Sequence, residues 1–140
     1  MRKIYIMGSL RNPRIPIIAN RFEKEGHDVF ADWFASGPET DDYWKTYEES
    51  RGRTYFQALK GKAAKNTFEF DKKWLDWADT VVMVLPAGRS AHMEFGRAVG
   101  QGKPAYVLFD EEPVDRWDVM YQFATDVYDD LEVLVEELSE

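Results

Sequence analysis

The sequence predicts a three-layer α/β domain built on a flavodoxin- or Rossmann-like parallel sheet of about five strands. Three short apolar runs, bounded by Gly, Pro or charged residues, are the main observation: Lys3–Met7, Thr80–Leu85 and Ala105–Phe109. None of these runs alternates polar and apolar residues, which is typical of parallel strands buried on both faces. Helical stretches separate the runs, and this alternation favours a parallel sheet with right-handed crossovers.

The remaining elements follow from turn signals and amphipathic periodicity. A fourth strand is expected at 28–33, after the helix stop at Gly26, and a short fifth strand at 123–127. Helices are expected at 13–25, 40–65, 67–78, 91–100 and 127–138. A length of 140 residues fits one domain, which spans residues 1–140 and carries an aromatic-rich insertion at about 35–65.

The insertion is too long for a simple crossover and begins just after a strand end. Its aromatic residues are Tyr43, Trp44, Tyr47 and Tyr55. One interpretation is a lid over a ligand site, in which Trp33 or Trp44 stacks on a base. The other is a helical pair whose aromatic side chains pack against each other.

Composition excludes several classes of function. A net charge of −8 argues against binding a nucleic acid polymer, which relies on Lys and Arg to displace phosphate counterions. No apolar run approaches the ~20 residues of a membrane span. Cysteine is absent, which favours the cytoplasm and removes thiolate metal ligands, and two isolated histidines predict no metal site. Neither a Walker A spacing nor G-x-G-x-x-G occurs, so no nucleotide cofactor is expected.

In parallel α/β sheets, ligands bind outside the carboxyl ends of the strands. The loops expected at that edge are 8–11, 33–34 and 86–90. Their candidate ligand-binding residues are Gly8, Ser9, Arg11, Trp33, Gly88, Arg89 and Ser90. Small residues and arginines in such loops can hold a phosphate or a sugar hydroxyl. The alternative is a Gly-Ser turn with a solvated arginine, which is a common feature.

Two carboxylates are the candidates for chemistry. Glu94 lies one turn into the helix after the strand Thr80–Leu85, where it faces the ligand edge or merely complements the helix dipole. Asp71 shares a helix face with Leu75 and Ala78, where an unpaired carboxylate is costly unless it has a partner or a role. A helix cap or an ion pair is the alternative for Asp71. Two carboxylates at one edge suggest glycosidic chemistry, in which one of them acts as the nucleophile.

Four stretches together resemble the nucleoside 2-deoxyribosyltransferase superfamily, which includes deoxyribonucleoside 5′-monophosphate N-glycosidases and CMP hydrolases. They are 3–11 (KIYIMGSLR), 70–84 (FDKKWLDWADTVVMV), 88–96 (GRSAHMEFG) and 97–109 with its Gly-Lys-Pro turn. The resemblance covers most of the chain except the aromatic insertion, and it lies in the order and spacing of the stretches.

The resemblance implies an enzyme that cleaves or transfers the N-glycosidic bond of a nucleoside or nucleoside 5′-monophosphate. Glu94 would attack the anomeric carbon, and Asp71 would position it or aid proton transfer to the base. The sugar hydroxyls or the 5′-phosphate would be held by Ser9, Arg11, Gly88 and Ser90. The family's sites usually lie between subunits, which implies a homodimer or larger homo-oligomer; the stretch 121–126 would be the donated one.

One departure from the family pattern affects the substrate. Deoxyribosyltransferases have an Asp shortly before the glutamate that contacts the base, whereas 86–91 (PAGRSA) contains no acid. Arg11 and Arg89 instead favour a phosphorylated substrate. Two alternatives stay open: cleavage of the nicotinamide–ribose bond of an NAD-type dinucleotide, and a nucleotide-binding sensor without turnover.

Overall fold

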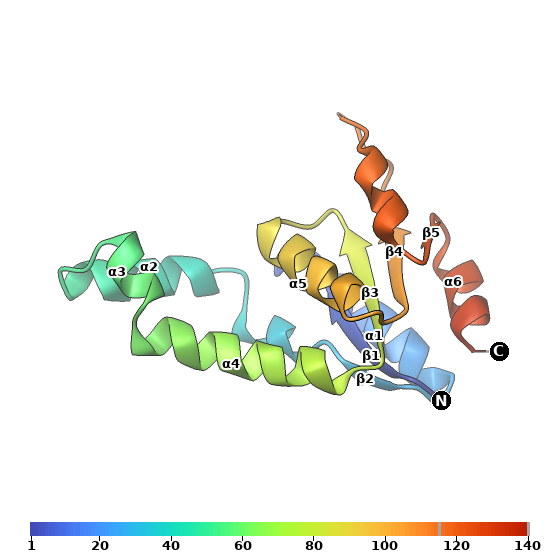
Figure 1. Ribbon diagram of the computed structural model, residues 1–140, viewed down its shortest axis with the longest axis horizontal. Coiled ribbons are helices and arrows are strands. Elements are labelled where there is room, and N and C mark those ends of the chain that lie inside the picture. The colour runs from blue at the N-terminus through green and yellow to red at the C-terminus, as the bar shows by residue number, and fades with distance from the viewer. Residues whose placement is uncertain (115, 140) are drawn as a thin grey trace.

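The computed structural model describes residues 1–114 and 116–139, and a parallel five-stranded sheet lies at its centre (Figure 1). The strand order is β2-β1-β3-β4-β5. The strands are β1 (Lys3–Met7), β2 (Asp28–Phe30), β3 (Thr80–Leu85), β4 (Ala105–Phe109) and β5 (Asp126–Tyr128). This architecture confirms the predicted α/β fold, and the strand order is that of flavodoxin-like sheets.

Helices cover both faces of the sheet. On one face, α1 (Ile15–Lys24) and α6 (Leu131–Leu138) pack over the β1 side chains Ile4 and Ile6. On the other face, α4 (Lys62–Trp77) and α5 (Arg89–Gly100) pack over Tyr5 and Met7. The period-2 alternation of β1 therefore sends its aliphatic side chains into one core and Tyr5 into the other, toward α5.

The insertion differs from the prediction in its helix boundaries. Instead of helices at 40–65 and 67–78, the chain forms α2 (Thr40–Ser50), a short α3 (Tyr55–Leu59) and then the long α4. Gly52 has a φ of 73°, a conformation that glycine adopts without strain, and it ends the first helix. A capping box between Thr54 and Gln57 starts α3. Helices α2 and α3 project away from the sheet, to the left in Figure 1.

Several other helix and strand boundaries also differ from those predicted. The strand predicted at 28–33 ends at Phe30, and Trp33 lies in a 3-10 helix, η1 (Asp32–Ser36). The fifth strand is β5 rather than 123–127, since a second 3-10 helix, η2 (Val119–Phe123), precedes it. As a result, the C-terminal helix begins at Leu131 instead of 127, where Asp130 accepts hydrogen bonds from the first-turn N–H groups. Helix α5 begins two residues earlier than predicted, and α1 is shorter at both ends.

The order of the strands places a switch point between β1 and β3. The chain leaves β1 to cross to β2 on one side, and it leaves β3 to cross to β4 on the other. The loops after β1 and β3 therefore diverge, and ligands bind in the crevice between such loops. No helix in the described part of the chain is both long and apolar enough to cross a membrane.

Candidate active site

A cavity of about 600 Å³ opens at this switch point. Its wall is built from the loops after β1 and β3, from η1, and from α2, α4 and α5. Every candidate residue from the sequence lines it: Gly8, Ser9, Arg11, Trp33, Asp71, Gly88, Arg89, Ser90 and Glu94. The fold thus brings together residues from all three predicted loops and from two helices, although their roles stay predictions.

Glu94 is held by a tyrosine that also lines the cavity. The Tyr5 hydroxyl donates a 2.6 Å hydrogen bond to Glu94 Oε2, across 89 residues of sequence. Tyr5 is 1% exposed, so its hydroxyl needs a partner inside the protein. A short hydrogen bond to a carboxylate is stronger than a neutral one and fixes the orientation of the Glu94 side chain.

An aromatic stack fixes Tyr5 in turn. Its ring stacks on Phe30 with centroids 5.6 Å apart, and Phe30 stacks on Trp74 at 4.7 Å with an interplanar angle of 5°. Phe70 contacts the edge of the same Phe30 ring. Because β1, β2 and α4 all contribute to this stack, the position of the Tyr5 hydroxyl is set by the core.

Both carboxylates are harder to ionise than usual. Burial raises the pKa of Glu94 to about 7; the hydrogen bond from Tyr5 opposes that rise, and the charge of Asp71 adds to it. Burial also raises the pKa of Asp71. Among the described residues, neither carboxylate forms an ion pair with a lysine, arginine or histidine. Perturbed acids in a cavity are typical of catalytic sites.

The loop after β1 lies close against the body of the protein. A Cβ atom on Gly8 would come within 2.8 Å of Ile15 Cδ1 and 3.3 Å of the Val84 carbonyl oxygen, so a larger side chain would displace its neighbours. Ser9 then turns the chain, because its Oγ accepts a hydrogen bond from the backbone N–H of Arg11.

The loop after β3 leads into the N-terminus of α5. Its N-cap, Gly88, has no side chain to accept a hydrogen bond from the first turn, and that turn contains no acid. The exposed N–H groups and the helix dipole favour an anion at this position.

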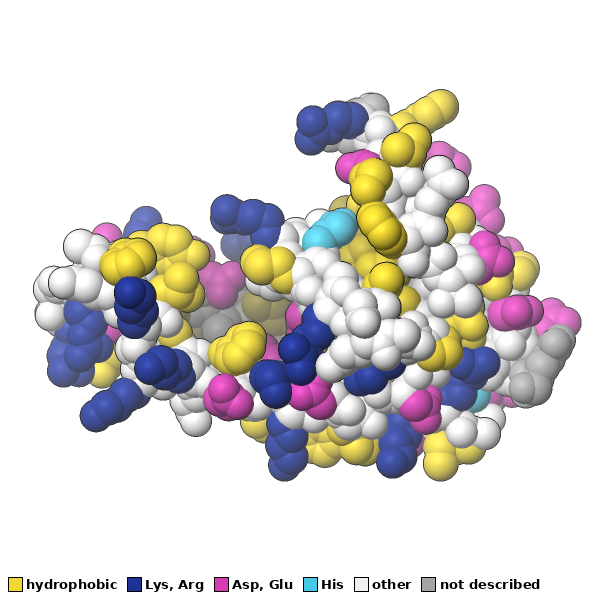
Figure 2. Space-filling model, in the orientation of Figure 1, with side chains coloured by type: hydrophobic (Ala, Val, Ile, Leu, Met, Phe, Trp, Pro, Cys, Tyr) yellow, Lys and Arg dark blue, Asp and Glu magenta, His cyan; other side chains and the backbone are white. Residues whose placement is uncertain are grey.

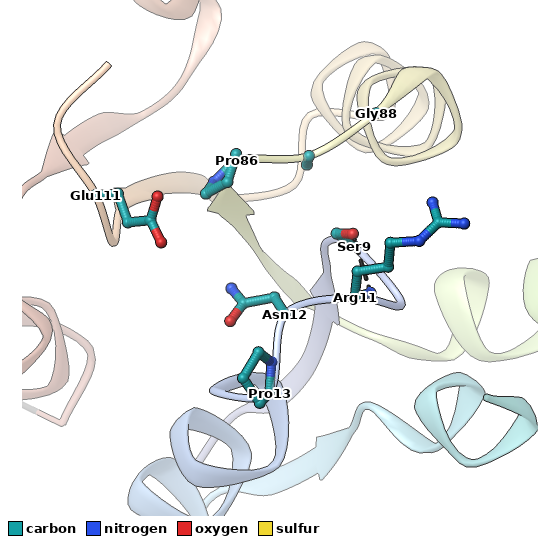
Figure 3. A pocket seen from close by; sticks show the side chains of 8 residues that line it. Ser9, Arg11, Asn12, Pro13, Pro86, Gly88 and Glu111 are labelled. Carbon is teal, nitrogen blue, oxygen red and sulfur yellow. Dashed lines mark hydrogen bonds between the residues drawn. The ribbon is translucent and has the colours of Figure 1, made fainter. Parts of the chain in front are cut away.

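A second hollow of about 320 Å³ adjoins the main cavity (Figure 3). The two share Ser9, Arg11 and Gly88 in their walls. Asn12 and Glu111 also line the second hollow, and the Arg11 side chain points away from both of them (Figure 3). The candidate site therefore adjoins a second hollow that the sequence motifs did not indicate.

Sequence reasoning missed several residues of the site. Tyr5 is the most important of them. The feature of the sequence that could have revealed it is a hydroxyl-bearing side chain within an otherwise aliphatic buried strand. Asp32 and Asp41 also line the cavity, as do Phe70 and Thr67. The two aspartates come from the segment after β2, so the site has further acids although 86–91 has none.

The insertion combines features of a lid over the cavity and of a helical pair that packs its own aromatic side chains. Trp33 lines the cavity, while its indole N–H donates a 2.7 Å hydrogen bond to the carbonyl of Ile6. Trp44 instead bonds to Glu48 and packs its edge against Tyr55, within the insertion itself. Within the insertion, only residues near its start line the cavity: Ser36, Pro38, Thr40 and Asp41.

Comparison with known proteins supports the fold. No protein-family model matches the chain, and no curated protein matches its sequence. A solved structure of the 2-deoxyribosyltransferase from the psychrotolerant bacterium Bacillus psychrosaccharolyticus is 16% identical, with a TM-score of 0.63, over 95% of this chain and 90% of that one.

Two further structures are similar. A conserved protein from Enterococcus faecalis V583 is 15% identical with a TM-score of 0.65, over 99% of this chain and 97% of that one. The Clostridium botulinum CMP N-glycosidase BcmB is 12% identical with a TM-score of 0.57, over 99% of this chain and all (100%) of that one. The chain therefore shares the fold of the 2-deoxyribosyltransferase and of the CMP N-glycosidase, and this fold agrees with the one expected from its sequence motifs.

Proposed function

We propose that this protein cleaves or transfers the N-glycosidic bond of a nucleoside or a nucleoside 5′-monophosphate. The observation that carries the proposal is Glu94, a partly buried carboxylate without a cationic partner among the described residues. It lies in a cavity at the switch point of the sheet and accepts a hydrogen bond from Tyr5. Two proteins of the same fold act on such substrates, which agrees with this chemistry.

In the proposed reaction, a Glu94 oxygen attacks the anomeric carbon of the sugar while the bond from that carbon to the base nitrogen breaks. The base leaves with the bonding electron pair and takes up a proton. Asp71, whose pKa is raised by burial, is suited to donate that proton or to position Glu94. Attack of water or of a second base on the anomeric carbon then releases Glu94, completing hydrolysis or transfer respectively.

The cavity wall carries both basic and acidic side chains, which suits a nucleotide. Arg11 and Arg89, together with the N-terminus of α5, offer positive charge and N–H donors for a 5′-phosphate. Asp32 and Asp41 offer hydrogen-bond acceptors for the N–H groups of a base. The proposed substrate is therefore a nucleoside 5′-monophosphate, with Trp33 as an apolar surface for the sugar or base.

The test is release of free base, followed by chromatography. The panel contains nucleosides, cytosine, uracil and purine 5′-monophosphates, and NAD, each with and without an acceptor base. Release into water indicates a hydrolase, and release only with an acceptor indicates a transferase. Release of nicotinamide alone would point to a dinucleotide hydrolase, and tight binding without turnover to a sensor.

The Glu94→Gln variant tests the nucleophile. It should lose roughly 10³-fold or more in rate, because an amide oxygen cannot form the covalent sugar ester. Glu69→Gln, an exposed position on α4, is the matched control and should keep full activity. Turnover by Glu94→Gln close to that of the control would refute the assignment.

A further inference from the structure

His92 lies on α5, two residues before Glu94, and the proposed reaction gives it no role. Its side chain is exposed, and Figure 2 shows a histidine side chain (cyan) beside hydrophobic side chains of the segment that follows β4. Both ring nitrogens nevertheless have partners within the protein. Nδ1 lies 2.7 Å from the Gly88 carbonyl oxygen, and Nε2 lies 3.0 Å from the Tyr121 hydroxyl oxygen. Water could satisfy an exposed imidazole, so two internal partners at these distances indicate a defined orientation of the ring.

The two partners also fix the position of the proton on the ring. A carbonyl oxygen can only accept a hydrogen bond, so Nδ1 carries the hydrogen and donates it to Gly88. In the neutral ring Nε2 is then the acceptor, and the Tyr121 hydroxyl donates to it. Burial raises the pKa of Tyr121, so this hydroxyl keeps the proton that it donates. The hydrogen bonds therefore run in one direction, from Tyr121 through His92 to Gly88.

Gly88 is a part of the cavity wall that has little other support. It is the N-cap of α5, and it lines both the main cavity and the adjoining hollow. The backbone N–H of His92 reaches the Gly88 carbonyl at 3.4 Å, whereas Nδ1 of the same residue reaches it at 2.7 Å. In the part of the chain that the structure describes, no other group of residues 86–88 forms a hydrogen bond. The imidazole is thus the shortest tie between the loop after β3 and the helix that carries Glu94.

Tyr121 gives the imidazole a support outside α5. It lies in η2, and its ring packs edge-on against Phe109 at the end of β4, with centroids 5.4 Å apart and an interplanar angle of 83°. The same tyrosine ring lies against the His92 ring, at 5.8 Å between centroids. The position of the imidazole is therefore set by β4 and η2 as well as by its own helix.

We propose that His92 is a positioning residue of the candidate active site, which holds the loop after β3 in the conformation that receives the 5′-phosphate of the substrate. The proposal rests on the proposed function, which places that phosphate near Arg11, Arg89 and the N-terminus of α5. The N–H groups that follow Gly88 would bind the phosphate, and their direction depends on the peptide unit that the imidazole holds. His92 itself lines neither the cavity nor the adjoining hollow, so it acts through Gly88 and does not touch the substrate.

This role has a consequence that separates binding from chemistry. Without the imidazole, the loop must be ordered when the phosphate binds, and that ordering weakens the affinity for a phosphorylated ligand. A nucleoside has no phosphate and should bind nearly as well as before. Glu94 is oriented by Tyr5 instead, so the rate after binding should hardly change. We therefore expect a rise in KM for the 5′-monophosphate at nearly constant kcat.

Four variants test the proposal. His92→Leu removes both hydrogen bonds of the ring. His92→Asn keeps an N–H donor close to the position of Nδ1, so it should restore the bond to Gly88. Tyr121→Phe removes only the hydroxyl that orients the ring, and it keeps the test open if His92→Leu fails to fold. Met93→Leu, at a neighbouring position that is 70% exposed, is the matched control.

Binding is measured by titration calorimetry on the full chain. The probes are the nucleoside 5′-monophosphates of the panel above, each paired with its nucleoside. His92→Leu should weaken binding of the 5′-monophosphate by about fivefold, which is the loss of one hydrogen bond, and binding of the nucleoside by less than about twofold. His92→Asn and Met93→Leu should stay close to the wild type, and Tyr121→Phe should fall between His92→Leu and the wild type. Circular dichroism checks the fold of each variant.

Several results would overturn the proposal. They are an equal loss for nucleoside and 5′-monophosphate, a His92→Asn variant no better than His92→Leu, unchanged binding in both His92→Leu and Tyr121→Phe, and a wild type that binds no 5′-monophosphate. The proposed reaction fails separately. A wild type that binds 5′-monophosphates through His92 but releases no base would refute the reaction and keep the positioning role. Base release with a KM that is unchanged in His92→Leu would do the reverse.

Discussion

The two ends of the central sheet both hold polar side chains within apolar surroundings, but only one end pairs them fully. At the amino end, Arg2 donates hydrogen bonds to the Leu138 carbonyl and to Thr80 Oγ1, and its backbone N–H donates to His27 Nδ1. His27 Nε2 in turn meets Ser139 Oγ at 3.1 Å. This network ties the first strand to the last helix.

At the carboxyl end, the polar groups face a cavity instead of one another. Glu94 has the Tyr5 hydroxyl as its partner, and Asp71 has no hydrogen bond among the described residues. Burial without a cation raises the pKa values of both carboxyls. The protein thus leaves charge uncompensated at the end where a ligand can enter, at an expense in stability that a purely structural site would avoid.

The two ends consequently respond to pH in opposite directions. Burial lowers the pKa of His27 below its usual value, so the folded state takes up a proton less readily than the unfolded chain. Stability from this group is present above pH 6.5 and is lost as the pH falls. Glu94 has a raised pKa, so its contribution is present below about pH 4.5 and is lost as the pH rises toward 7.

The largest expected effect is a change in the free energy of unfolding when a carboxylate at the carboxyl end of the sheet is replaced. Glu94→Gln removes the buried ionisable group, so at pH 8 the variant should be more stable than the wild type by roughly 3 kcal/mol, and about equally stable at pH 4. Urea unfolding at both pH values measures the difference. The exposed control Glu69→Gln should show no such dependence, and an equal difference at both pH values would contradict the account.

The second prediction concerns the hydrogen-bond network at the amino end of the sheet. Arg2→Met removes the side-chain bonds to Leu138 and Thr80, and it should lower the free energy of unfolding by about 2 kcal/mol. The pH profile of kcat/KM should not move, because this network is remote from the cavity. The exposed neighbour variant Lys3→Met should change stability by less than about 0.5 kcal/mol. A shifted activity profile would show that the two ends are coupled.

The sequence predicted the buried parts of the fold better than the insertion. The apolar runs at β1, β3 and β4 begin and end where predicted, because both faces of each strand are covered and few alternatives bury them. Within 40–78, by contrast, helix propensity is high throughout, and the breaks depend on Gly52, on Gly61 and on the cap at Thr54. The helix expected to begin at Thr67 begins at Lys62 instead, so Thr67 lies inside α4.

In the candidate site, too, some features could be predicted from the sequence and others could not. Its loops could be placed at one edge because parallel strands share their carboxyl ends. The contact between Tyr5 and Glu94 could not be predicted, because it joins a strand and a helix 89 residues apart in sequence. The acids Asp32 and Asp41 were missed because η1 and the start of α2 carry no motif that would turn them toward the cavity.

The third prediction concerns Tyr5, whose hydrogen bond lowers the pKa of Glu94. Tyr5→Phe should move the acid limb of the kcat/KM profile above pH 7 and reduce kcat/KM at pH 7 by about tenfold. Part of that loss should return at pH 9, where Glu94 is ionised in either protein. Loss of equal size at all pH values would mean that Tyr5 supports only the packing of the core.

The smallest expected effect distinguishes the role of Asp71 from that of Glu94. The charge of Asp71 adds to the raised pKa of Glu94, after burial, so Asp71→Asn should move the acid limb of kcat/KM to lower pH, opposite to Tyr5→Phe. The plateau rate should fall as well, since the proposed proton donor is gone. Asp76→Asn is the matched control on the same helix, because Asp76 pairs with Lys72 and Arg97 outside the cavity. If Asp71→Asn lowers the plateau without moving the limb, then Asp71 acts on the substrate and not on the ionisation of Glu94.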